Sequence, residues 1–164
     1  MPNRRNSSIA HNATAIPTPL GALWVEASAD AIVRAEFRRL PDAADESRHP
    51  LLREARVQVR AYFARKLARF DLPLRYEGTP FQCAVWHAVA QLEFGHFVSY
   101  AEVARAINRP LAHRGVAAAM AKSPLDLLIP AHRVVGADGR LKGCAPRSIR
   151  ARLVRFERAT ACAR

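Results

Sequence analysis

Alternating apolar and polar positions mark the first part of the chain. Two such runs lie within residues 15–28, separated by the turn-forming segment 17–21 with its prolines and glycine, and residues 31–37 contain a third run. Period-two alternation between turn signals is typical of strands with one buried face. We therefore expect a small antiparallel sheet.

Helical spacing replaces this alternation after an acidic, proline-containing loop at residues 40–50. One amphipathic helix should pack on the sheet, because its apolar positions recur every three or four residues with basic residues between them. Residues 70–76 are extended and interrupted by Pro73, which favours an edge strand or a linker to a second half. The apolar stripe of the helix comprises Leu52, Ala55, Val59, Tyr62, Phe63 and Leu67.

Two helix start signals stand in the second half. Thr79 is followed by a proline at the first helical position and by Gln82, a combination that predicts a helix ending before Gly95. Ser99 and Glu102 form another capping box and should open a second helix. The apolar positions of the first of these helices are Phe81, Val85, Val89 and Leu92.

The second capping-box helix should end before Pro110, and a further helix carrying Arg114 is expected over residues 111–122. Two short helices with a tight connection are typical of a helix-turn-helix, which presents one helix to a groove of nucleic acid. The pattern is also common in helix pairs that are purely structural. It leaves both interpretations open.

In the last part of the chain, a histidine lies at the end of a predicted strand. Residues 127–129 are an apolar run typical of a buried strand, and His132 follows shortly after. A turn at 136–139 and a final helix containing Glu157 come next. A lone histidine is more often a core residue with satisfied hydrogen bonds than a functional group.

Together these elements predict an α/β fold in two parts. Residues 1–13 are polar and lack periodicity, so they should be a disordered start. Residues 14–76 should form an N-terminal α/β domain, and residues 77–164 a mainly helical C-terminal domain. A chain of 164 residues, 50% of them hydrophobic, can form one domain or two small ones that share a core.

Net charge adds a hint about the partner. The chain has 26 Lys and Arg residues against 14 Asp and Glu, a formal net charge of +12. Such an excess favours a polyanion, nucleic acid first, because each neutralised phosphate releases a counterion and arginine binds phosphate oxygens with two donors. The alternative is a basic composition that only keeps the protein soluble.

The cysteine positions and the hydropathy exclude several classes of protein. Cys83, Cys144 and Cys162 fit neither a disulfide framework nor a paired-thiol zinc site, and no metal or cofactor is expected. No apolar run approaches the roughly 18–20 residues of a membrane span. We expect a cytoplasmic protein with no membrane partner.

One set of residues carries more information than any single motif. Its members are Phe81-Gln82, Val85-Trp86, Ser99-Tyr100, Arg114, Val116, Ser123-Pro124, Ile129-Pro130-Ala131-His132-Arg133-Val134 and Glu157. In residue type and spacing this set resembles the O6-alkylguanine-DNA alkyltransferase family, and the resemblance extends over nearly the whole chain. It implies a ribonuclease H-like N-terminal domain and a DNA-binding C-terminal domain of the winged helix-turn-helix type.

The resemblance places Ala131 where the family has its nucleophilic cysteine. In the family a thiolate, supported by a histidine and a glutamate that match His132 and Glu157, irreversibly takes the alkyl group from guanine O6. Displacement at carbon needs a lone pair, and an alanine side chain has none. The resemblance thus implies a protein like the alkyltransferase-like group, which binds O6-alkylguanine without repairing it and assists DNA repair.

The resemblance also implies how duplex DNA with the damaged base is held. Tyr100 would rotate the nucleotide outward, while Arg114 fills the vacated space from the minor groove. Main-chain carbonyls at Ala131 and Val134 would read the flipped base. The resemblance further implies nucleotide excision repair proteins as partners, and we expect a monomer.

Departures from the family pattern bear on this site. Ser123 replaces the family's asparagine and is counted, with Arg133, among the base-binding residues. The loop after Gly143 is shorter than in the family. Two alternatives stay open: a methyltransferase that uses Cys144 of this loop as the acceptor, and a helix-turn-helix regulator that reads ordinary sequence.

Overall fold

A three-stranded antiparallel sheet opens the fold. The computed structural model describes residues 12–37 and 48–161. The strands β1 (Asn12–Thr18), β2 (Gly21–Ala27) and β3 (Ile32–Glu36) lie in the order β1-β2-β3, which confirms the predicted sheet. The strand β1 includes Pro17, expected in the turn, because an edge strand tolerates a residue without an N–H donor.

The start of β1 corrects one boundary. Asn12 and Ala13 belong to the strand, although they fall in the segment predicted to be disordered. Ala13 is buried and pairs with Glu26 of β2, so the ladder extends further than the alternation of side chains indicated. The rest of that start, and most of the acidic loop at 40–50, lie outside the described residues.

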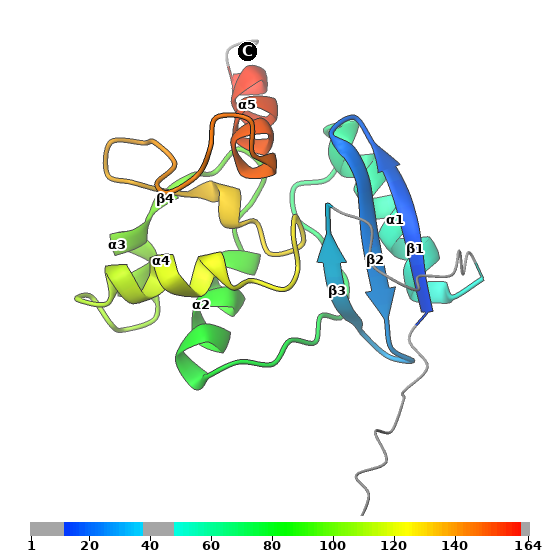
Figure 1. Cartoon of the computed structure of the whole chain (residues 1–164), viewed down its shortest axis with the longest axis horizontal. Helices are drawn as coiled ribbons and strands as arrows, with labels where there is room; N and C mark the ends of the chain where they lie inside the picture. Colours follow the sequence, from blue (N-terminus) through cyan, green and yellow to red (C-terminus); the bar gives the residue numbers. More distant parts are fainter. Residues whose placement is uncertain (1–11, 38–47, 162–164) are drawn as a thin grey trace, which may run out of the picture.

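The helix α1 (Pro50–Phe63) packs on one face of the sheet (Figure 1). The predicted stripe is buried as far as Tyr62, but the helix ends before Leu67. Gln58, a polar residue of this helix, is also buried: its amide donates to the carbonyl of Asp71 at 2.9 Å and accepts from the Asp71 N–H at 2.8 Å. This pair of bonds fixes the segment 70–76, which is a linker with a single bridge, from Leu74 to Ile32.

Both predicted capping boxes are present in the second half. Thr79 and Gln82 open α2 (Pro80–Ala90), and Ser99 and Glu102 open α3 (Tyr100–Ala106). The next helix, α4 (His113–Ala121), starts two residues later than expected. The remaining elements are β4 (Val98–Ser99), a 3-10 turn (Ala131–Arg133), β5 (Val134–Val135) and α5 (Ile149–Ala161).

The strand predicted at 127–129 is wrong. These residues are buried, but the chain turns there, with Leu127 at a φ of 69°, and the parallel partner of β4 is β5. An apolar run that is covered on all sides has no periodicity, so its sequence does not distinguish a strand from a buried turn. The neighbouring Leu125 forms an isolated bridge with Ala35 of the sheet.

The two halves share one hydrophobic core. Side chains from the sheet, α1, α2, α4 and the segment 125–129 belong to a single buried cluster. Trp86 of α2 is 2% exposed, and its indole N–H donates to the carbonyl of Ala119 at 2.9 Å. In Figure 1 the sheet with α1 lies on one side and the helices α2, α3 and α4 on the other, with α5 above them. None of the described helices is long and apolar enough to cross a membrane.

Candidate functional site

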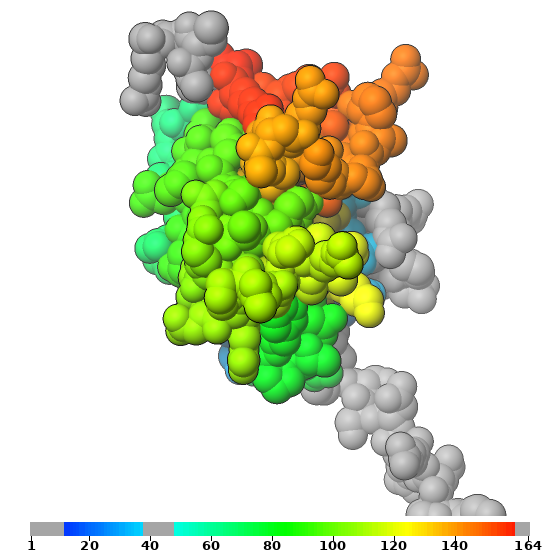
Figure 2. Space-filling model, turned by 90° about the vertical axis from the view of Figure 1, so that its left-hand side faces the viewer, coloured from blue at the N-terminus to red at the C-terminus, as the bar shows by residue number. Residues whose placement is uncertain are grey.

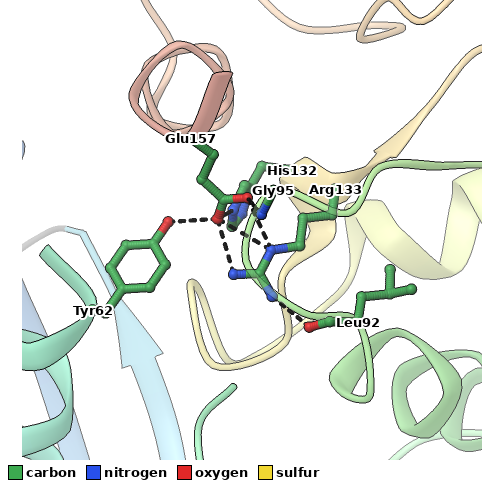
Figure 3. Close-up of polar contacts among 6 residues, drawn as sticks. All are labelled: Tyr62, Leu92, Gly95, His132, Arg133 and Glu157. Carbon is green, nitrogen blue, oxygen red and sulfur yellow. Dashed lines mark hydrogen bonds and ion pairs between the residues drawn. The ribbon is translucent and has the colours of Figure 1, made fainter. Parts of the chain in front are cut away.

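A buried ion pair forms the polar centre of the second half (Figure 3). The carboxylate of Glu157, on α5, accepts hydrogen bonds from Nε2 of His132 at 2.8 Å and from Nη2 of Arg133 at 2.9 Å. All three residues are at most 2% exposed. His132 and Arg133 are consecutive in the 3-10 turn that follows the segment 125–129, so this turn directs two neighbouring side chains at one carboxylate.

Other segments meet at the same carboxylate. The Tyr62 hydroxyl of α1 donates to Oε1 of Glu157 at 2.7 Å, and the Gly95 N–H donates to Oε2 at 2.9 Å. Arg133 also donates through Nη1 to the carbonyl of Leu92 (Figure 3). Glu157 therefore joins α1, the segment after α2, the 3-10 turn and α5.

The buried environment and the hydrogen bonds determine the protonation states of Glu157 and His132. Burial alone would raise the pKa of Glu157, but the hydrogen bonds from His132 and Arg133 outweigh burial and lower it to about 2. Burial lowers the pKa of His132, and the positive charges of Arg133 and Arg150 lower it further, against the raising effect of Glu157. An ionised carboxylate only accepts, so Nε2 of the neutral imidazole carries the proton and Nδ1 keeps its lone pair.

Stability should fall with acid in two stages. Because the pKa of folded His132 lies below the usual 6.5, the unfolded chain takes up more protons as pH falls through 6.5, and the folded state loses stability. The contribution of Glu157 is present above its unfolded pKa of 4.5 and is lost as pH falls from 4.5 towards 2. Denaturant midpoints measured as a function of pH should show both stages. His132→Gln should remove the upper stage, whereas an unchanged midpoint between pH values of about 7 and 5 would contradict the buried neutral imidazole.

A cavity of about 380 Å³ lies beside this network. Small-molecule sites in proteins occupy roughly 300–1,000 Å³, so the cavity has the size of a ligand site. Its walls come from the end of α4, the segment 123–132, the loop 143–148 and the start of α5. The residues that the sequence singled out and that line it are Ser123, Ala131, His132 and Cys144.

The other expected site residues lie elsewhere. Arg114 is exposed in the first turn of α4, and Tyr100 is half-buried at the start of α3. Val134 is buried and does not line the cavity. Arg133, expected among the base-binding residues, directs its guanidinium to Glu157 instead.

One helix connects the cavity with Arg114. Met120 and Ala121, at the end of α4, line the cavity, and Arg114 lies six residues earlier on the same helix, about 9 Å along its axis. Gly115 allows this helix to approach α2, because a Cβ atom there would lie 3.1 Å from the Phe81 ring. Figure 2 looks onto the face formed by α3, the connection to α4 and the loop after β5.

Comparison with known protein families shows to which family the chain belongs. The model of the family described as "6-O-methylguanine DNA methyltransferase, DNA binding domain" matches residues 80–159, and that of the corresponding "ribonuclease-like domain" matches residues 13–76. The chain belongs to the 6-O-methylguanine DNA methyltransferase family. Both halves of the fold are therefore family domains, as the sequence pattern indicated.

Individual members of the family are similar over most of their length. A methylated-DNA--protein-cysteine methyltransferase of Methanosarcina barkeri is 37% identical over 79% of this chain and 85% of its own. A DNA base-flipping protein of Thermus thermophilus is 40% identical over 87% of this chain and 97% of its own. The structure of Mycobacterium tuberculosis OGT in complex with DNA has a TM-score of 0.78 and 29% identity, covering 90% of this chain and 93% of that chain.

Two residues of the site are not part of the motif by which the sequence resembles the family. Tyr62 belongs to the apolar stripe of α1 in the sequence, and its hydroxyl reaches Glu157 only in the fold. Arg150 is one of 26 basic residues, yet its guanidinium lines the cavity and donates to the Ala131 carbonyl at 2.9 Å. Within the described segments, no cluster of histidine, cysteine and acidic residues is arranged to hold a metal ion.

Proposed function

We propose that this family member binds O6-alkylguanine in duplex DNA without transferring the alkyl group, and so assists DNA repair. The observation that carries the proposal is a base-sized cavity lined by His132 and Ala131, the latter being the residue that the resemblance places at the family's nucleophilic cysteine. The flipped base would enter this cavity. The protein would act as a monomer that marks the lesion for excision-repair proteins.

The chemistry of position 131 supports binding without transfer. Attack on the alkyl carbon needs a lone pair placed in line with the leaving O6 atom, and the methyl group of Ala131 offers none. His132 and Glu157 still form their hydrogen bond, but there they hold the wall of the cavity and activate no thiol. The absence of sulfur also leaves more room for the substituent on O6.

The α3–α4 pair would act as the helix-turn-helix of this protein. Tyr100, at the start of α3, would displace the target phosphate, and Arg114, exposed on α4, would fill the space left in the base stack. Flipping costs a few kcal/mol and least for a weakly paired base, which favours an alkylated guanine. The carbonyl of Ala131 would then read the base, with Ser123 in the cavity wall, whereas Val134, which lies outside the cavity, is given no contact with the base. Arg133 would position Glu157 rather than touch the base.

One experiment tests binding and transfer together. A duplex with a single O6-methylguanine, labelled on the methyl group, is mixed with the protein, and its affinity is measured against the same duplex with guanine at a fixed salt concentration. We expect tighter binding of the damaged duplex and no label on the protein. Equal affinity for both duplexes, with a preference among sequences, would instead support a regulator that reads ordinary DNA.

Arg114→Ala should weaken binding of the O6-methylguanine duplex roughly ten- to hundredfold, since side-chain stacking on a base is worth about 1–3 kcal/mol. Arg53→Ala is the matched control, because it removes the same charge from an exposed position on α1. Fluorescence anisotropy with both duplexes measures the effect. Equal losses in the two variants would mean that Arg114 contributes only non-specific attraction.

A second function is favoured by the position of Cys144. This residue lines the same cavity as Ala131 and His132, and its Sγ lies 3.1 Å from the Ser148 hydroxyl. A thiol here would act as alkyl acceptor if it reached the line of the C–O6 bond. Mass spectrometry after incubation with alkylated DNA discriminates the two functions: a mass gain on the peptide containing Cys144, absent in Cys144→Ser, would establish the methyltransferase.

A further inference from the structure

Two residues in the wall of the cavity each carry a buried polar atom without a hydrogen-bond partner among the described residues. Among the described residues, the buried side-chain nitrogen and oxygen atoms without a partner are His49 Nδ1, Ser123 Oγ and Arg150 Nε. The last two belong to residues that line the same 380 Å³ cavity. A buried polar group that makes no hydrogen bond destabilises the fold. Two such groups in residues that line one cavity therefore suggest that a ligand supplies the missing partner.

Arg150 is held beside the centre of the site. Its Nη2 donates to the carbonyl of Ala131 at 2.9 Å, which holds one end of the guanidinium at the main chain of that residue. Its positive charge also acts on the imidazole of His132. The second residue of α5 thus supplies a cation beside Ala131 and His132.

Within the described part of the chain, Arg150 forms no ion pair with a carboxylate. Glu157, on the same helix, is engaged by Arg133 and His132. Asp126 also lines the cavity, but it is exposed, and its Oδ2 accepts from the N–H of Phe37 at 3.3 Å. The cavity wall therefore holds Arg150 and Ser123 among both apolar residues and polar ones, the latter including His132 and Ser148.

We propose that Arg150 and Ser123 bind an acceptor oxygen on the O6 substituent of the flipped guanine, so that the cavity favours carboxylate-bearing adducts over hydrocarbon adducts of the same size. This inference rests on the proposed function. Rotation about side-chain bonds brings both donors to the ligand, and a charge-assisted bond from arginine to a carboxylate is about twice as strong as a neutral one. A purely hydrocarbon substituent leaves both groups without partners.

Two isosteric adducts test the proposal. Duplexes with O6-carboxymethylguanine and with O6-isobutylguanine carry substituents of equal heavy-atom number, and the guanine duplex is the reference. The natural protein should bind the carboxymethyl duplex about tenfold or more tightly than the isobutyl duplex. Arg150→Met should reduce this ratio to about one, Ser123→Ala should reduce it partly, and Arg150→Lys should retain part of it.

Arg147→Met is the matched control, because Arg147 is exposed in the same loop region and does not line the cavity. It removes one positive charge and should leave the ratio of the two affinities unchanged. If the Arg150→Met protein fails to fold, Arg150→Lys and Ser123→Ala still report on the ratio. A thermal unfolding curve of each variant confirms that folded protein is compared.

The outcomes separate this inference from the function on which it rests. Equal affinity of the natural protein for the two adduct duplexes, both tighter than guanine, would overturn the role of Arg150 and Ser123 and leave lesion binding intact. A ratio that drops as much in Arg147→Met would also overturn it, since general attraction of negative charge would then explain the preference. Failure of both adduct duplexes to bind more tightly than guanine would refute the proposed function itself.

Discussion

Ala131→Cys should convert the protein from one that transfers no label to one that accepts about one methyl group per molecule. The variant places a thiol beside His132, whose Nδ1 lone pair is available because Nε2 donates to Glu157. Nucleophiles held in line react as if present at concentrations on the order of 10⁵ M or above. Gel analysis after incubation with an O6-methylguanine duplex labelled on the methyl group measures the transfer.

Ala131→Ser is the control for this gain. A serine side chain is close in size to cysteine, but its hydroxyl is a weak nucleophile without a strong base, so label should stay on the DNA. An Ala131→Cys protein that binds the damaged duplex and remains inert would show that the missing sulfur is not the only defect. Ser123 or the short loop after Gly143 would then be the next positions to restore.

Glu157→Ala should destabilise the fold by about 3–5 kcal/mol, the usual cost of removing one partner from a buried ion pair. Arg133 would keep a buried positive charge with only the Leu92 carbonyl beside it, and the Tyr62 hydroxyl and the Gly95 N–H would lose their acceptor. Equilibrium unfolding in urea, extrapolated to water, measures the loss.

Two further variants, Glu157→Gln and Glu93→Ala, serve as comparison and control for Glu157→Ala. Glutamine keeps the shape and one acceptor oxygen but removes the charge, so its cost should lie between zero and that of alanine. Glu93 is exposed, and its replacement should change the free energy of unfolding by no more than about 0.5 kcal/mol. A Glu157→Ala variant as stable as Glu93→Ala would contradict the central position of this carboxylate.

Local signals account for the parts of the fold that the sequence predicts well. Thr79 with Gln82, and Ser99 with Glu102, mark the starts of α2 and α3 because a capping box is complete within four residues of chain. The strands of the sheet follow from alternation between turns. The segment 127–129 is mistaken for a strand because burial on all sides removes any periodicity.

The site is less readable than the fold, because it is assembled across the chain. His132 and Glu157 emerge only through resemblance to a family. Tyr62 is hydrogen-bonded to Glu157, which lies 95 residues later in the sequence, and no local sequence pattern predicts that contact. Arg133 shows the opposite case: a basic residue in a DNA-binding motif suggests a contact with the base, whereas the fold uses its charge inside the core.

The hydrogen bonds of Glu157 have a consequence for reading related sequences. Its carboxylate holds α1 and α5 together as well as the imidazole, so the histidine–glutamate pair is needed for the fold whichever residue stands at position 131. Presence of that pair in a genome-derived sequence is therefore no sign of a working repair enzyme. Under the proposed function, the residue before the histidine, and not the pair itself, separates a protein that takes up the alkyl group from one that only binds the damaged base.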